Sequence, residues 1–84
     1  MSKNKDYPLK ECLKAAENLI AKGCEVHQKF TCSKCGERLT IEKPNTFYPE
    51  GKCYICKGVT DITKTGCNYL VIGPSDVVLG AGLP

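Results

Sequence analysis

The chain has 84 residues, a formal net charge of +3 and seven cysteines. A domain of this size buries only about 60% of the surface that its unfolded chain exposes, so its hydrophobic core is small and a bound metal would add needed stability. The longest apolar run, Tyr69 to Ile72, is far too short to cross a bilayer, which argues against a membrane-spanning protein.

Residues 1–6 are polar, rich in lysine and without the apolar core of a signal peptide, so we predict a flexible N-terminus over 1–7 and a cytoplasmic location. A helix is predicted over residues 8–23, because Pro8 suits a first helical position and Gly23 suits a left-handed cap. Apolar residues recur at helical spacing and form one stripe, which we expect to cover a sheet. The stripe consists of Leu9, Cys12, Leu13, Ala16, Leu19 and Ile20.

Residues 24–72 are predicted to form a small antiparallel sheet. Polar and apolar residues alternate over 24–31, which places Val26 and Phe30 on an inner row that the polar Gln28 interrupts. Further strands are predicted at 39–41, 59–62 and 67–72. The last of these strands is almost continuously apolar, so we expect it in the interior of the sheet.

Four of the cysteines form two Cys-x-x-Cys pairs separated by seventeen residues. Two thiolates three residues apart on a tight turn can occupy two corners of a tetrahedron, and a second pair supplies the other two. Gly36 and Gly58 follow the pairs and would tolerate positive φ where backbone N–H groups approach sulfur. The pattern predicts one structural Zn²⁺, without which the domain should unfold. The predicted ligands are Cys32, Cys35, Cys53 and Cys56.

Three other roles of paired cysteines fit the sequence less well. A thioredoxin-like redox pair opens a helix, whereas the residues after Cys35 alternate like a strand. A disulfide scaffold needs an oxidising compartment and would leave one of the seven cysteines unpaired. An iron site of the rubredoxin type uses the same four thiolates, so the spacing alone leaves iron as the alternative metal.

The lone histidine and the cysteines outside the pairs are predicted to be structural. Cys12 lies in the helical stripe and Cys67 in a strand, where both should pack as small hydrophobic residues. His27 precedes Cys32 by five residues, a spacing that fits no common ligand turn. We therefore expect His27 to be exposed on the outer face of its strand.

The loop at 43–51 carries Phe47 and Tyr48, which we expect to cover the core, with a stacking platform for bases or a partner pocket as the alternative. A tight turn is predicted at 64–66. Residues 73–84 form a C-terminal tail, which we expect to pack back or to stay loose. The alternative is that Val77 to Leu79 add a strand to the sheet edge of another protein.

The turns Cys32-Ser-Lys-Cys-Gly36 and Cys53-Tyr-Ile-Cys-Lys-Gly58 resemble those of zinc ribbons, and the resemblance covers residues 24–72. It implies a small antiparallel zinc-ribbon sheet. Because the helical stripe predicts that the N-terminal amphipathic helix packs on this sheet, the expected fold is α+β and forms one domain. A wider set of segments also resembles small uncharacterised zinc-ribbon proteins of bacteriophage genomes, which implies a phage or prophage origin but no activity. These segments are Glu25-Val-His-Gln-Lys-Phe-Thr-Cys32, Lys43-Pro-Asn-Thr-Phe47, Thr60-Asp-Ile62 and Gly66-Cys-Asn-Tyr-Leu70.

Two functions are compatible with such a domain. We favour a non-enzymatic module that binds an unidentified protein partner, because four cysteines leave no open metal position for a catalytic water. Four thiolates and one Zn²⁺ contribute −2, which lowers the formal charge to about +1. The alternative is a nucleic-acid-binding ribbon of the transcription or replication type, which the neighbouring Glu37 and Glu42 make less favourable. Its contacts would be Lys34, Arg38, Lys52 and Lys57 to phosphates and Tyr54 to a base.

Overall fold

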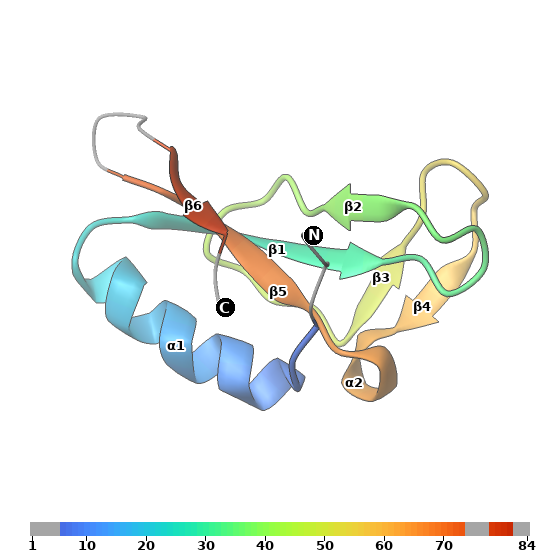
Figure 1. The fold of residues 1–84 in the computed structure, drawn as a ribbon, viewed down its shortest axis with the longest axis horizontal. Coiled ribbons are helices and arrows are strands. Elements are labelled where there is room, and N and C mark those ends of the chain that lie inside the picture. The colour runs from blue at the N-terminus through green and yellow to red at the C-terminus, as the bar shows by residue number, and fades with distance from the viewer. Residues whose placement is uncertain (1–5, 74–77, 82–84) are drawn as a thin grey trace, which may run out of the picture.

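The structure of the protein is a computed structural model, and it describes residues 6–73 and 78–81. It contains two helices and six strands in these ranges (Figure 1). In chain order they are α1 (Leu9–Ala21), β1 (Glu25–Thr31), β2 (Arg38–Thr40), β3 (Glu50–Lys52), β4 (Val59–Asp61), α2 (Ile62–Thr65), β5 (Asn68–Ile72) and β6 (Val78–Ala81).

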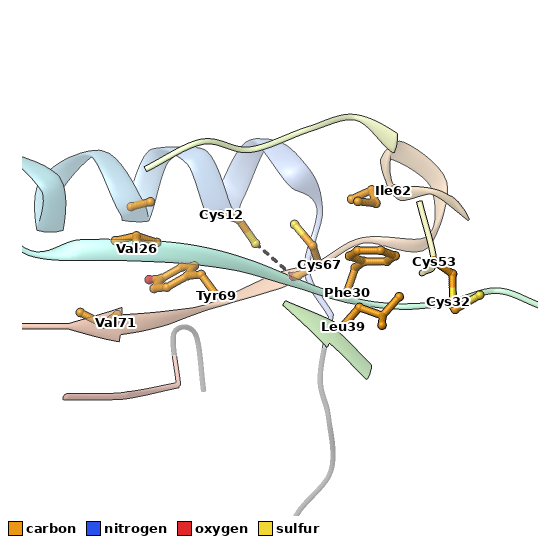
Figure 2. Close-up of a cluster of buried hydrophobic side chains, with 11 residues drawn as sticks. Cys12, Val26, Phe30, Cys32, Leu39, Cys53, Ile62, Cys67, Tyr69 and Val71 are labelled. Carbon is orange, nitrogen blue, oxygen red and sulfur yellow. Dashed lines mark hydrogen bonds between the residues drawn. The ribbon is translucent and has the colours of Figure 1, made fainter. Parts of the chain in front are cut away.

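The strands form two antiparallel sheets. The larger sheet has the strand order β2-β1-β5-β6, and the smaller sheet pairs β3 with β4. Helix α1 contacts β1 and β5 and lies along one face of the larger sheet (Figure 2). The predicted α+β arrangement with an N-terminal helix packed on strands is confirmed. Within the described ranges, neither helix is long and apolar enough to cross a membrane.

Helix α1 ends in the way that its glycine predicts. Gly23 has a φ of +93°, and its N–H donates a hydrogen bond of 3.0 Å to the carbonyl of Ile20. The N–H of Cys24 donates to the carbonyl of Leu19 at 3.1 Å. This pair of bonds is a Schellman motif, which satisfies carbonyl groups that the helix itself leaves without partners.

The buried face of α1 is formed by the small residues of its apolar stripe. Cys12 and Ala16 are fully buried, whereas Leu9, Leu19 and Ile20 are half-buried around them. Leu13 is 40% exposed, so the prediction that it belongs to the covered stripe is wrong. It lies one residue, or about 100°, around the helix from Cys12 and therefore sits at the rim of the contact.

The core contains two buried cysteines outside the Cys-x-x-Cys pairs, as the sequence predicts. The thiol of Cys12 donates to the carbonyl of Cys67 at 3.1 Å, which is the dashed line in Figure 2. Hydrogen bonding with Cys67 and desolvation raise the pKa of the Cys12 thiol, so this group stays protonated and packs as a hydrophobic residue.

The polar Gln28 lies on the inner row of β1, as predicted, and its buried side chain is fully satisfied. Gln28 Oε1 accepts from the backbone N–H of Tyr48 at 2.9 Å, and Gln28 Nε2 donates to the Tyr48 carbonyl at 3.0 Å. Asn45, whose φ is +57°, likewise bonds to both backbone groups of one residue, Val26, at the edge of β1. Its N–H donates to the Val26 carbonyl at 2.7 Å, and its Oδ1 accepts from the Val26 N–H at 2.9 Å. Together these bonds attach the loop to β1.

Only one of the two loop aromatics covers the core with its side chain. The ring of Phe47 packs against the core and meets Tyr69 edge to face, with centroids 6.2 Å apart. The Tyr48 side chain is 37% exposed, and this residue binds Gln28 through its backbone. The expected lid therefore consists of Phe47 rather than of both aromatics.

Strand β3 and helix α2 are absent from the sequence prediction. Strand β3 centres on Gly51, a residue of low strand propensity, so no alternating pattern marks it. The strand predicted over 59–62 ends at Asp61, whose carboxylate accepts from the N–H of Thr63 at 3.1 Å and starts α2. One turn of helix therefore occupies the position of the predicted tight turn.

Strand β5 lies inside the larger sheet, as its apolar sequence predicts, but it is not the last strand. Cys67, predicted to open it, instead forms an isolated bridge with Tyr7 through bonds of 2.8 and 2.9 Å. Strand β6 pairs with β5 in the antiparallel direction. The described part of the tail therefore extends the sheet of its own chain, and Val77 lies outside the described residues.

Gly51 is predicted to be essential for core packing. A Cβ atom at Gly51 would lie 2.3 Å from Cζ of Phe30, whose ring is fully buried. The substitution Gly51→Ala should therefore lower the free energy of unfolding by about 1–3 kcal/mol through overpacking. Urea unfolding in the presence of Zn²⁺ measures this loss.

The substitution Phe30→Leu provides the control, because leucine lacks the three ring atoms nearest to Gly51. The double variant Gly51→Ala/Phe30→Leu should lose less stability than the sum of the single losses. Additive losses would contradict a direct clash between these residues.

Candidate metal centre

Each cysteine pair lies in the turn of a hairpin, and the two turns have matching backbone bonds. In the β1–β2 turn, the Cys32 N–H donates to the backbone carbonyl of Glu37 at 2.9 Å, and the Gly36 N–H donates to the backbone carbonyl of Cys32 at 3.0 Å. In the β3–β4 turn, the Cys53 N–H donates to the backbone carbonyl of Gly58 at 2.9 Å, and the Lys57 N–H donates to the backbone carbonyl of Cys53 at 3.0 Å. We name these turns knuckle 1 (residues 32–37) and knuckle 2 (residues 53–58).

The left-handed residue of knuckle 2 differs from the sequence prediction. Gly36 has a φ of +79°, as expected, but the equivalent residue in knuckle 2 is Lys57, at +64°, and not Gly58. Gly58 instead provides space, because a Cβ atom there would lie 2.5 Å from Cδ of Lys34. Knuckle 2 therefore holds a lysine in the left-handed conformation, which costs about 1–2 kcal/mol for a residue other than glycine.

Backbone N–H groups point at the first sulfur of each pair. The N–H groups of Cys35 and Lys34 donate to Cys32 Sγ at 3.5 and 3.4 Å, and they lower the pKa of the Cys32 thiol to about 6. The N–H of Cys56 donates to Cys53 Sγ at 3.3 Å and lowers the pKa of Cys53. Both knuckles are therefore built to stabilise thiolates.

The structure brings the two pairs together at one place. The sulfurs of Cys32, Cys35, Cys53 and Cys56 lie within 4.8 Å of one another. The distances Cys32–Cys56 and Cys35–Cys53 between Sγ atoms are both 3.6 Å. A tetrahedral ion with metal–sulfur bonds of about 2.3 Å requires sulfurs about 3.8 Å apart, so the cluster can hold one such ion.

The charge of the cluster also favours a cation. The Glu37 N–H lowers the pKa of Cys35, but desolvation and the three neighbouring cysteine sulfurs outweigh it and raise that pKa to about 12. Without a positive ion the four sulfurs therefore cannot all be ionised at neutral pH. Cys32 and Cys53 are buried against the core, whereas Cys35 and Cys56 lie at the surface.

A direct link joins knuckle 1 to the hairpin of knuckle 2. Thr60 of β4 is fully buried, and its Oγ1 accepts from the backbone N–H of Ser33 at 2.9 Å. The two hydroxyl groups also lie 3.3 Å apart. Sequence reasoning missed this contact, because nothing in the local pattern distinguishes one strand threonine from another. Thr60 thus holds knuckle 1 against the hairpin that carries knuckle 2.

The residues predicted for nucleic-acid contact do not form one free basic surface. Arg38 Nη1 donates to Asp6 at 2.6 Å and to the Thr31 hydroxyl at 3.0 Å, which leaves the arginine side chain only 19% exposed. Lys34, Lys52 and Lys57 are exposed on or beside the knuckles, and Tyr54 is 71% exposed in knuckle 2.

The histidine is not part of the metal cluster. His27 is half-buried rather than exposed, because Nδ1 lies 3.0 Å from the Ile41 carbonyl and Nε2 lies 3.2 Å from Glu25. In the part of the chain that the structure describes, the group of potential ligands around the knuckles consists of cysteines alone.

Comparison of the sequence and the structure with protein-family models, curated proteins and solved structures finds no match. The four-cysteine cluster fits a zinc-ribbon-like site on its geometry alone. The resemblance to bacteriophage proteins stays a prediction.

Removal of the Thr60 hydroxyl is expected to weaken metal binding. The variant Thr60→Val should raise the dissociation constant for Co²⁺ about tenfold, because knuckle 1 loses its anchor on β4. Thiolate-to-cobalt absorption during titration measures the affinity. Thr46→Val is the matched control, since its hydroxyl donates to the Pro44 carbonyl at 3.1 Å and Thr46 lies outside both knuckles. Equal affinities of the two variants would show that Thr60 does not position the site.

Proposed function

We propose that this protein is a small non-enzymatic zinc-ribbon domain in which one structural Zn²⁺ joins two knuckles and supports binding to a protein partner. The observation that carries the zinc site is the cluster of four sulfurs with spacings close to those of a tetrahedron. The ion would be held by Cys32, Cys35, Cys53 and Cys56.

The donor set supports a structural zinc ion. Four thiolates fill a tetrahedral shell and leave no position for a water or a substrate, which is the arrangement of structural and not catalytic zinc. Iron takes the same tetrahedral sulfur ligands, so the metal content of the purified protein must separate the two ions. A closed shell on two surface turns supports a role in holding the fold together.

Exposed apolar side chains near the metal centre support a protein partner. Tyr54 and Ile55 of knuckle 2 are 71% and 52% exposed, and Val59 at the start of β4 is 49% exposed. Such side chains are common in protein interfaces, and aliphatic ones do not stack on bases as aromatic ones do. Knuckle 2 is therefore the part of the surface that we assign to partner binding.

A nucleic-acid-binding function is supported less well. Tyr54 and Lys57 are exposed in knuckle 2, and the exposed Lys34 of knuckle 1 lies against Gly58 of knuckle 2. These three side chains suit contacts to phosphate and base. Arg38, however, is already paired with Asp6. The zinc–thiolate group would also place a charge of −2 beneath the lysines.

Native mass spectrometry is expected to find one zinc ion per chain. A strong chelator should remove the ion and unfold the domain, because structural zinc supplies roughly 10–16 kcal/mol of apparent binding energy. The variant Cys53→Ser should lose both the ion and the cooperative unfolding transition. The matched control Cys24→Ser changes a half-buried cysteine outside the cluster and should keep the ion. A wild-type chain that folds without metal would disprove the structural role, and bound iron would correct the metal.

Binding to nucleic acid is expected to be weak and nonspecific. Zinc-loaded protein titrated into labelled single- and double-stranded DNA and RNA across a salt series should show little affinity at 150 mM salt, since Arg38 is paired with Asp6 and the zinc–thiolate group would carry a charge of −2. A steep fall of affinity with salt that Lys34→Glu/Lys57→Glu abolishes would instead identify a nucleic-acid-binding ribbon.

A further inference from the structure

Strand β2 lies at the end of the larger sheet and has one open side. It pairs with β1 alone, and no strand of residues 6–73 or 78–81 pairs with its other edge. The Glu37 carbonyl accepts from Cys32, and the Ile41 N–H donates to Gln28, so these residues turn their backbone groups towards β1. Backbone direction alternates along a strand, and Arg38 and Thr40 therefore present theirs to the open side.

A groove of about 570 Å³ lies along this edge. One side is formed by β2 and the residues that follow it, and Tyr54 of knuckle 2 forms the other side. Its lining residues are Arg38, Thr40, Ile41, Glu42 and Tyr54. Leu39 is missing from the lining because its side chain is buried in the core. The groove therefore combines open backbone groups with an aromatic wall, which is the arrangement that accepts an added strand.

The two ends of the groove differ in how much charge they leave free. At one end Arg38 Nη1 donates to Asp6 at 2.6 Å, so the charge of this arginine is already paired. Glu42 lies at the other end and forms no ion pair within the described part of the chain. A phosphate backbone would be repelled by Glu42, whereas a peptide can carry a basic side chain opposite it.

We propose that this groove binds an extended segment of a protein partner, which adds to β2 as an antiparallel strand and reads basic-x-apolar from its N-terminus. The alternate spacing follows from the strand period of two, which places every second side chain on one face. The antiparallel direction sets the basic residue opposite Glu42 and the apolar residue beside Tyr54. This inference rests on the proposed protein-interaction function and names its surface and partner chemistry.

The probe is the peptide Ac-Thr-Lys-Thr-Val-Thr-Thr-Thr-NH2, titrated into ¹⁵N-labelled zinc-loaded protein. Amide shifts should concentrate at residues 38–42 and at Tyr54, and the amide protons of Arg38 and Thr40 should exchange more slowly when the peptide is bound. A peptide with Glu in place of Lys should bind roughly fivefold more weakly, because its carboxylate then lies opposite Glu42. Absence of shifts at millimolar peptide would overturn the proposal.

Two variants test the surface. Tyr54→Ala should weaken peptide binding roughly tenfold, whereas Tyr48→Ala, the same change at a tyrosine outside the groove lining, should leave it unchanged. Thr40→Pro removes an outward N–H from an edge strand and should also weaken binding while the fold is kept. Binding that both Tyr54→Ala and Thr40→Pro leave unchanged would overturn the proposal.

Two further measurements separate this inference from its alternatives. Native mass spectrometry of each sample reports zinc independently, so peptide failure with full zinc rejects the groove without rejecting the metal site. A concentration-dependent dimer that Thr40→Pro dissociates would show that a second copy occupies the edge, and would overturn the peptide proposal.

Discussion

The meeting of four cysteine sulfurs is the constraint on which the rest of the structure depends. Their two hairpins belong to different sheets, β1–β2 to the larger and β3–β4 to the smaller. Between the sheets lie the packing of Phe30 on Gly51 and the hydrogen bond from Ser33 to Thr60. A cation shared by the sulfurs would hold the hairpins together far more strongly than these contacts, because the core of so short a chain is small.

Polar side chains hydrogen-bond to backbone groups that have no partner in a neighbouring strand of the described ranges. The Gln28 amide binds both backbone groups of Tyr48, and Asn45 binds both backbone groups of Val26. Gln28 is thereby satisfied inside the core, and Asn45 satisfies the edge of β1 at Val26, beyond the residues that pair with β2. The loop that they attach carries Phe47 onto Tyr69, so a segment without regular structure closes one end of the core.

The metal centre and the β2 edge are physically connected through knuckle 2. Tyr54 lies between Cys53 and Cys56, so the same turn that presents two sulfurs also forms one side of the groove. Holding the sulfurs in one place would fix the backbone of knuckle 2 at Tyr54 relative to β2. A structural ion could thereby organise a binding surface without any chemistry of its own, which links stability to the proposed interaction.

Local patterns in the sequence determined the helix, its cap at Gly23, the inner row of β1, the interior position of β5 and the grouping of the four cysteines. Each of these features depends on residue spacing or on the conformational freedom of one residue. The tertiary structure alone decided the pairing of β3 through Gly51, the link between Thr60 and Ser33, and the ion pair that occupies Arg38. These features join residues that are distant in sequence, so their formation depends on which surfaces the folded chain brings together, and no local pattern records that.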